Sequence, residues 1–206
     1  MSAGPASQHY RVRVFVDFWN YTLAMRDADA GFRTDWSLLG PAVSSAAASS
    51  VGSQVRHTYQ GMSVHGSYDP SRDRKLLNWA TTVLGGFAGV RVDFSPRRKR
   101  RGAPSCPRCH ASVDRCPQCG SDMRGTEEKG VDVRMAIEMI SLAMLGSYDI
   151  AVLVSSDRDF IPVAEFLSSR GITVIHAAFG SLGAELSQSC WTRIDLPHLR
   201  PSFERS

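Results

Sequence analysis

The sequence predicts an α/β domain of three layers, in which helices cover both faces of a central, mainly parallel sheet. Short runs rich in Val, Ile and Phe alternate along the 206 residues with longer segments of helical spacing. Residues 149–156 hold a continuous apolar run, as expected of a central strand buried on both faces. The composition, 43% hydrophobic and 21% charged, is typical of a globular domain. Strands that alternate with helices form βαβ units, whose strands lie parallel.

The first half of the chain is expected to hold three strands and two helices. Their Val and aromatic content predicts strands over residues 10–18, 53–63 and 90–94. Thr34 or Asp35 can start a helix over residues 34–49, which Gly40-Pro41 weakens in its middle. Asp69-Pro70 favours the start, and Gly85-Gly86 the end, of a second helix over residues 69–86.

The second half is expected to continue the alternation. A helix is predicted over residues 129–147, because aliphatic side chains recur on one face that should pack on the sheet: Val133, Ala136, Ile137, Ile140 and Met144. After the central strand, a helix over 159–171 ends at Gly171 and precedes an apolar strand over 172–179. A short helix over 181–190 and an edge strand over 191–196 complete the domain.

One domain is therefore expected over residues 10–196, with a disordered lead at 1–9 and a tail at 197–206. The lead lacks the charged-then-apolar order of a secretory signal. No apolar run approaches the roughly 20 residues of a membrane span. We expect a cytoplasmic protein without a membrane partner, and the oligomeric state stays open, a homo-oligomer included.

The basic charge of the chain is concentrated in an insertion. Residues 97–124 carry a net charge of +6, whereas the rest of the chain carries −2. This polar segment is nearly free of aliphatic residues and should lie outside the core. A polyanion is the partner that such a segment favours.

The same insertion contains four of the five cysteines. Two CPxC turns, six residues apart, are formed by Cys106, Cys109, Cys116 and Cys119. This spacing favours a closed, structural Zn²⁺ site with four thiolate ligands, and a redox pair is the alternative. His110 directly follows Cys109 and is a poor substitute ligand. Cys190 is expected in the core.

Acidic residues follow the predicted strands where ligands bind in parallel sheets, at the carboxyl ends. Asp17 ends the first strand, Asp157 and Asp159 follow the central strand, and Asp132 opens the helix at 129–147. Each alone could simply cap a turn or helix. Together, four carboxylates repel one another and favour a hard divalent cation, Mg²⁺ or Mn²⁺. Asp93 is a weaker candidate, because alternation can place it outward.

Three motifs, "VFVDFWN", "KGVDV" and "VLVSSDRDF", resemble in order and spacing those of the NYN domain family of PIN-like, metal-dependent ribonucleases. The resemblance implies a PIN-like α/β/α sandwich and endonucleolytic cleavage of RNA. It also implies Mg²⁺ or Mn²⁺ bound by Asp17, Asp132, Asp157 and Asp159, with Asn20 orienting a carboxylate or a metal-bound water. Ser156 departs from the family, which often has Gly there, so the motif does not guarantee activity.

The leading hypothesis is a metal-dependent endoribonuclease whose insertion guides RNA. The guiding residues would be Arg97, Arg98, Lys99, Arg100 and Arg101, although such a run can also be a solvated arm. The alternative is a non-catalytic RNA-binding or adaptor protein. A phosphatase or topoisomerase-type site is disfavoured: the former needs a second Asp where Trp19 stands, and the latter a Glu at Asp17.

Overall fold

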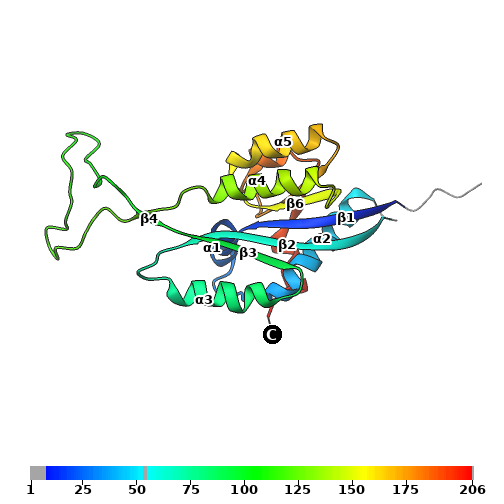
Figure 1. Cartoon of the computed structure of the whole chain (residues 1–206), viewed down its shortest axis with the longest axis horizontal. Coiled ribbons are helices and arrows are strands. Elements are labelled where there is room, and N and C mark those ends of the chain that lie inside the picture. Colours follow the sequence, from blue (N-terminus) through cyan, green and yellow to red (C-terminus); the bar gives the residue numbers. More distant parts are fainter. Residues whose placement is uncertain (1–7, 53–54, 206) are drawn as a thin grey trace, which may run out of the picture.

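The computed structural model describes residues 8–52 and 55–205, and its centre is a six-stranded sheet (Figure 1). The strands lie in the order β3-β2-β1-β6-β7-β8, and every neighbouring pair is parallel. Their bounds are β1 His9–Asp17, β2 Arg56–Tyr68, β3 Val90–Pro96, β6 Ile150–Val154, β7 Thr173–Ala178 and β8 Thr192–Asp195. The predicted α/β class with a central parallel sheet is confirmed.

Helices cover both faces of this sheet, as Figure 1 shows. On one face, the core contains side chains of α1 (Phe18–Ala28) and α2 (Trp36–Val51), with α3 (Arg74–Thr82) beside them. On the other face it contains side chains of α4 (Val131–Met144), α5 (Ile161–Ser169) and α6 (Ala184–Gln188). Alternation along β1 divides the strand between the two cores, since Val14 and Val16 face the first and Phe15 faces the second. Short 3₁₀ turns are formed by Leu84–Gly86, Arg158–Phe160 and Arg200–Ser202.

The face of α4 that packs on the sheet is not the predicted one. Val133 and Ile137, expected to be buried, are 61% and 58% exposed, and Met144 is also exposed. The buried side includes Met135 and Met139. The prediction was wrong because α4 carries apolar residues on both sides, so hydrophobic spacing alone does not select its inner face.

Helix α3 also begins later than predicted. Asp69 starts a turn instead of a helix, because its Oδ1 accepts hydrogen bonds from the N–H (2.8 Å) and hydroxyl (2.6 Å) of Ser71. Asp73 then accepts a bond from the N–H of Asp69 at 2.8 Å, and the helix starts at Arg74. Asp-Pro favours both a turn and a helix start, which explains the five-residue error.

The C-terminal segment is part of the fold, unlike the predicted tail at 197–206. Helix α7 (Leu196–Leu199) leads to Phe203, which is fully buried in the α1–α2 core. The main chain is fixed as well, because the N–H of Asp35 donates to the carbonyl of Phe203 at 2.8 Å. At the other end, β1 already includes His9, and residues 1–7 of the predicted lead lie outside the described residues.

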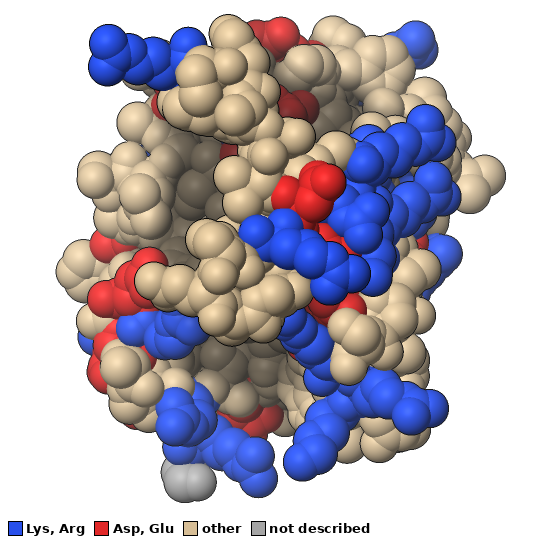
Figure 2. All heavy atoms as spheres, turned by 90° about the vertical axis from the view of Figure 1, so that its left-hand side faces the viewer, with Lys and Arg blue, Asp and Glu red and all other residues tan. Residues whose placement is uncertain are grey.

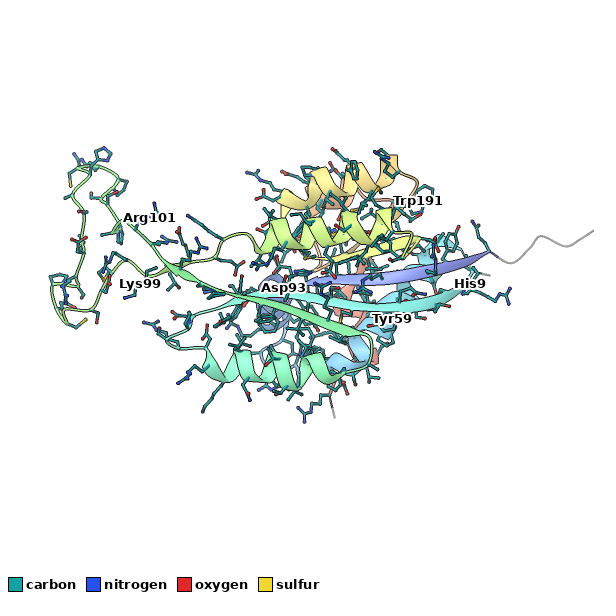
Figure 3. All side chains as sticks on the ribbon, viewed as in Figure 1. His9, Tyr59, Asp93, Lys99, Arg101 and Trp191 are labelled. Atoms are coloured by element: carbon teal, nitrogen blue, oxygen red, sulfur yellow. The ribbon has the colours of Figure 1, made fainter. Side chains whose placement is uncertain are left out.

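The insertion forms an arm that projects from the body (Figure 1). Two short antiparallel strands, β4 (Arg98–Lys99) and β5 (Thr126–Glu127), make its base. The arm leaves the sheet after the edge strand β3 and returns at the start of α4. Lys99 and Arg101 lie along it, away from the body (Figure 3). In the part of the chain that is described, no helix combines the length and apolarity needed to cross a membrane.

Candidate active site

The site is built on the carboxyl ends of the two central strands. Strands β1 and β6 are neighbours, with Val16 paired to Val154, so Asp17 and Ser155 leave the sheet side by side. Asp17 is only 5% exposed and starts α1. By alternation its side chain lies on the same face as Phe15, which is the α4 face.

Asn20 holds the Asp17 carboxylate in place. Its main-chain N–H donates to Asp17 Oδ1 at 3.1 Å, and its side-chain amide donates to Oδ2 at 2.9 Å. The other end of the Asn20 amide, Oδ1, accepts a bond from the N–H of Ser156 at 3.2 Å. Asn20 therefore ties the end of β1 to the loop after β6. Burial raises the pKa of Asp17, the bonds from Asn20 oppose this, and the charge of Glu128 adds to it.

The loop after β6 carries Asp157 and Asp159. The N–H of Asp157 donates to Ser155 Oγ at 3.1 Å, and Asp157 Oδ1 accepts from the N–H of Asp159 at 2.9 Å. Asp157 is half-buried and caps the 3₁₀ turn that follows, whereas Asp159 is exposed.

Buried groups support this loop from beneath. His176 Nε2 donates to the carbonyl of Ser155 at 2.7 Å, so Nδ1 of the neutral ring accepts from Ser187 Oγ at 2.7 Å. Burial lowers the pKa of His176, which keeps the ring neutral. Gly183 lies against the same loop, where an added Cβ would come within 3.0 Å of Ser156 Cα. Its φ of +71° also favours glycine.

Asp132, in the first turn of α4, interacts electrostatically with the other acids. Burial raises its pKa to about 6, together with the charges of Asp17, Asp157, Glu128 and Asp159. The four predicted acids thus share one electrostatic neighbourhood, although they come from three separate parts of the chain. Helix α4 can start here because Gly130, at φ +76°, turns the chain from the arm into the helix.

Glu128 is a fifth carboxylate that sequence reasoning missed. It lies where the arm rejoins the body, hydrogen-bonded to the Ser67 hydroxyl, with Arg97 Nη2 at 3.7 Å. Its charge raises the pKa of both Asp17 and Asp132. Its position four residues before Asp132 could have marked it as a candidate. It was missed because it ends a polar segment that was assigned to the insertion.

The chemistry of these side chains suits a hard divalent cation. All five are carboxylates, and their mutual repulsion is what such an ion neutralises. Across residues 8–52 and 55–205, however, no three His, Cys, Asp or Glu side chains are arranged as a ligand set. The residues therefore fit Mg²⁺ or Mn²⁺ by donor type and charge.

A second polar cluster, also missed from the sequence, borders the site on the same sheet face. Asp17, His65 and Asp93 form a row across β1, β2 and β3. His65 is 1% exposed, and its Nε2 lies 2.7 Å from Glu138 Oε2. Asp93, the weaker sequence candidate, lies 3.3 Å from Arg134 Nε and 3.7 Å from His65 Nδ1. It is therefore held by an ion pair at the sheet edge.

Glu138 is the centre of this polar cluster. Besides His65, it accepts bonds from Ser63 Oγ at 2.9 Å and Arg91 Nη1 at 3.2 Å. Burial alone would raise the pKa of Glu138, but the bonds from His65 and Ser63 and the charges of His65 and Arg91 hold it below its usual value. The cluster anchors α4, and hence Asp132, to β2 and β3.

The cysteines lie in two hairpins of the same geometry in the arm. The N–H of Cys106 donates to Ala111 O (2.9 Å), and that of Cys116 donates to Ser121 O (2.8 Å). His110 and Gly120, directly after each CxxC, both have positive φ, at 57° and 69°.

Local hydrogen bonds lower the pKa of one thiol in each hairpin. The N–H groups of Cys109 and Arg108 hold the pKa of the Cys106 thiol below its usual value, and bonds from Ser121 lower that of Cys119. Each hairpin brings its own pair together, but among the described residues no third ligand joins either pair. Cys190 is packed against the α4–α5 core, and burial raises its pKa to about 12.

The basic run begins at the body and continues along the arm. The Arg97 guanidinium lies over the Trp19 ring at 5.0 Å and donates to Ser67 Oγ at 2.8 Å. Arg98, Lys99, Arg100 and Arg101 are exposed. Figure 2, which views the molecule from the side of the arm, shows many Lys and Arg side chains with Asp and Glu between them.

Comparison with known proteins identifies a family and a similar solved structure. The family model of the NYN domain matches residues 11–197. A crystal structure of a protein of unknown function from Vibrio parahaemolyticus is similar with a TM-score of 0.55 at 16% identity, over 98% of this chain and 100% of that one. At this identity the likeness shows the fold alone. No curated protein matches the chain in sequence.

Proposed function

The chain belongs to the NYN domain family of PIN-like nucleases, and from this premise we propose that it is a metal-dependent endoribonuclease. The supporting observation is the convergence of carboxylates at the sheet edge: the charges of four other acids help to raise the pKa of Asp132. The proposed ligands of Mg²⁺ or Mn²⁺ are Asp17, Asp132, Asp157 and Asp159.

Each residue has a distinct part in this proposal. A Mg²⁺ or Mn²⁺ ion held by these carboxylates supplies a Lewis acid for the phosphodiester and lowers the pKa of a bound water. Asn20 fixes the orientation of Asp17, and the Ser155 hydroxyl fixes the main chain at Asp157. In this proposal Arg97, which lies close to Glu128 at the base of the arm, would contact a phosphate that approaches from the arm.

The arm is proposed to bind a structural Zn²⁺ through Cys106, Cys109, Cys116 and Cys119. The repeated hairpin geometry and the lowered thiol pKa values support this, since zinc binds thiolates. Ligation would join the two hairpins into one unit. The basic residues Arg97 to Arg101 would then contact the RNA backbone from a fixed base.

A non-catalytic RNA-binding or adaptor protein is the second candidate. It is favoured by the capping bonds of Asp17 and Asp157, which give both acids a structural use. Ser156, which stands where the family often has Gly, also favours a non-catalytic protein.

Cleavage of labelled single-stranded RNA in Mg²⁺ or Mn²⁺, against a chelator, separates the two candidates. We expect metal-dependent cleavage that is lost in Asp17→Asn and Asp157→Asn and kept in Asp27→Asn, which alters an exposed acid at the far end of α1. Cleavage that persists in both site variants would contradict the proposal. RNA binding without cleavage by the wild type would favour the second candidate.

A further inference from the structure

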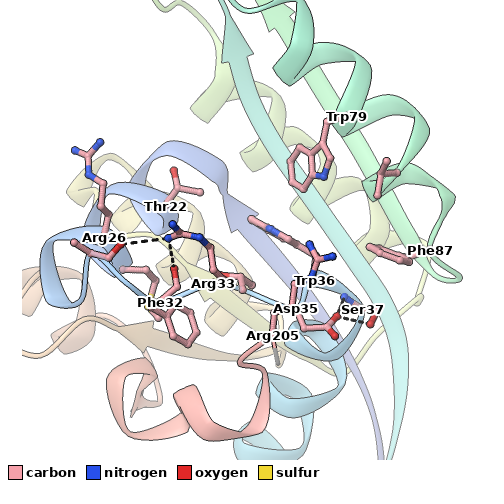
Figure 4. A pocket seen from close by; sticks show the side chains of 14 residues that line it. Thr22, Arg26, Phe32, Arg33, Asp35, Trp36, Ser37, Trp79, Phe87 and Arg205 are labelled. Carbon is pink, nitrogen blue, oxygen red and sulfur yellow. Dashed lines mark hydrogen bonds between the residues drawn. The ribbon is translucent and has the colours of Figure 1, made fainter.

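A second candidate site lies on the opposite face of the sheet from α4. It is a pocket of about 720 Å³, formed by α1, the loop between α1 and α2, the start of α2 and the end of α3 (Figure 4). This volume falls in the usual range for small-molecule sites, about 300–1,000 Å³. The side chains that decide its chemistry are Arg26, Arg33, Arg205, Trp36, Trp79 and Phe87.

The charge of the pocket favours an anion. Arg33 Nη1 donates only to the carbonyls of Ala30 and Phe32, each at 3.2 Å, and no carboxylate among the described residues pairs with it. Arg26 has only a 3.9 Å contact to the exposed Asp27. The single acid of the lining, Asp35, is occupied at the start of α2, where it accepts a bond from the N–H of Ser37 at 2.9 Å. Neither guanidinium group is thus held in a short ion pair, so both can bind phosphate.

The aromatic side of the pocket favours a flat, unpaired ring. Figure 4 shows Arg26 and Arg33 on one side, with Trp79 and Phe87 on the other. Trp79 and Phe87 are both only half-buried. Trp79 packs edge-to-face against Trp36, with ring centroids 5.9 Å apart. The indole N–H groups of Trp36 and Trp79 donate to no acceptor in the described part of the chain, so they remain available to polar atoms of a ligand.

An RNA strand bound at the acidic site could also extend into the pocket. Helix α1 starts at Asp17 and contributes Thr22, Met25 and Arg26 to the pocket. At 1.5 Å per residue, Arg26 lies about 14 Å along the helix from Asp17. Phe18, next to Asp17, packs on Trp79 with ring centroids 6.2 Å apart. One side of α1 therefore connects the two sites.

We propose that this pocket binds one unpaired nucleotide of single-stranded RNA, with the base against Trp79 and Phe87 and its phosphate on Arg26 and Arg33. The inference rests on the proposed function for the identity of the polymer, but it does not require cleavage. Aromatic stacking with arginine contacts to phosphate is a general means of holding single strands. A paired base, stacked within a duplex, would be excluded from the pocket.

The test is the affinity of the full chain for labelled single-stranded RNA, measured by fluorescence anisotropy in chelator so that no cleavage occurs. Arg33→Gln and Trp79→Leu are each expected to weaken binding about five- to tenfold. Both should leave affinity for duplex RNA within about twofold. The controls are Arg193→Gln and Trp191→Leu, which alter an exposed Arg and an exposed Trp outside the pocket, and they should bind like the wild type.

The outcomes separate this inference from the proposed function. Wild-type affinity in both pocket variants would contradict nucleotide binding in the pocket, whether or not the protein cuts RNA. An equal loss of duplex and single-strand affinity would overturn the unpaired nucleotide as its occupant. If the pocket variants weaken RNA binding but the wild type does not cleave RNA, the nucleotide-binding role of the pocket would be supported and the endoribonuclease function would be contradicted. Arg33 is exposed, so its variant stays informative if Trp79→Leu lowers the melting temperature.

Discussion

Asp132 illustrates how one side chain reports on the whole acidic site. Its usual pKa of 3.8 rises to about 6 through burial and four neighbouring negative charges. An acid whose pKa is higher in the folded than in the unfolded state destabilises the fold once it ionises. In the absence of a bound cation, ionised Asp132 therefore destabilises the fold at neutral pH, whereas protonated Asp132 does not.

We expect Asp132→Asn to stabilise the protein in chelator by about 1 kcal/mol at pH 7.5, after allowance for solvent screening at a half-exposed side chain. The gain should be complete above pH 6 and fade toward pH 4, where the wild-type carboxyl is protonated. Thermal unfolding at pH 7.5 and 4.5 measures this. Added Mn²⁺ should raise the melting temperature of the wild type and not of Asp132→Asn. A gain of equal size at both pH values would contradict this origin.

At the scale of elements, α4 shows where sequence patterns reach their limit. Large apolar residues lie on both its buried and its exposed side, and the buried carboxylate of Glu138 faces the sheet. Hydrophobic spacing could not predict this orientation, because Glu138 is satisfied by side chains of β2 and β3 that lie far away in sequence. The orientation is therefore a tertiary property.

Glu138→Gln is expected to destabilise the protein by about 2 kcal/mol at pH 7, because the variant keeps the shape but loses the charge that faces His65 and Arg91. The pKa of Glu138 is lower in the folded state, so its contribution is present above the unfolded pKa of about 4.5 and is lost as the pH falls further. Urea unfolding should show a smaller difference at pH 3.5 than at pH 7. Glu165→Gln, at an exposed position on α5, is the matched control. A pH-independent difference would exclude the ionic origin.

The arm is an element whose metal content can be measured directly. Purified protein should contain one Zn²⁺ per chain by elemental analysis, and Cys106→Ser or Cys116→Ser should lower this below one half. Cys190→Ser removes a thiol from the body and should keep the zinc. Zinc retained after loss of a cysteine from both hairpins would contradict the four-thiolate site.

At the scale of the whole molecule, the features that could be predicted are those marked by a short stretch of sequence. The alternation of strands and helices is a local pattern, and the confirmed parallel sheet follows from it. The acids at strand ends are also visible locally, because each follows an apolar run. The contribution of Glu128, the burial of Phe203 and the arginine–aromatic pocket depend on segments far apart in sequence, so no short motif marks them.

The uneven charge of the molecule leads to a prediction about RNA affinity. Replacing residues 100–125 by a short Gly-Ser turn should keep the body folded, since the arm joins it only through β4 and β5. The loss of five arginines should weaken RNA binding and reduce the slope of log affinity against log salt by about three. Titrations between 50 and 200 mM salt measure the slope. An unchanged slope would mean that the arm does not contact the RNA backbone.

The pairing of β1 with β6 also determines how late in synthesis the proposed active site can form. The hydroxyl of Ser155 lies 3.4 Å from the carboxylate of Asp17, although 138 residues separate them in the chain. Contacts across such a separation close late, because a long loop must be ordered first. While the ribosome is still translating, the nascent chain can display its basic arm before the centre of the sheet exists. The RNA binding proposed for the arm would thus precede the proposed cleavage, because only a nearly complete chain brings the acids together.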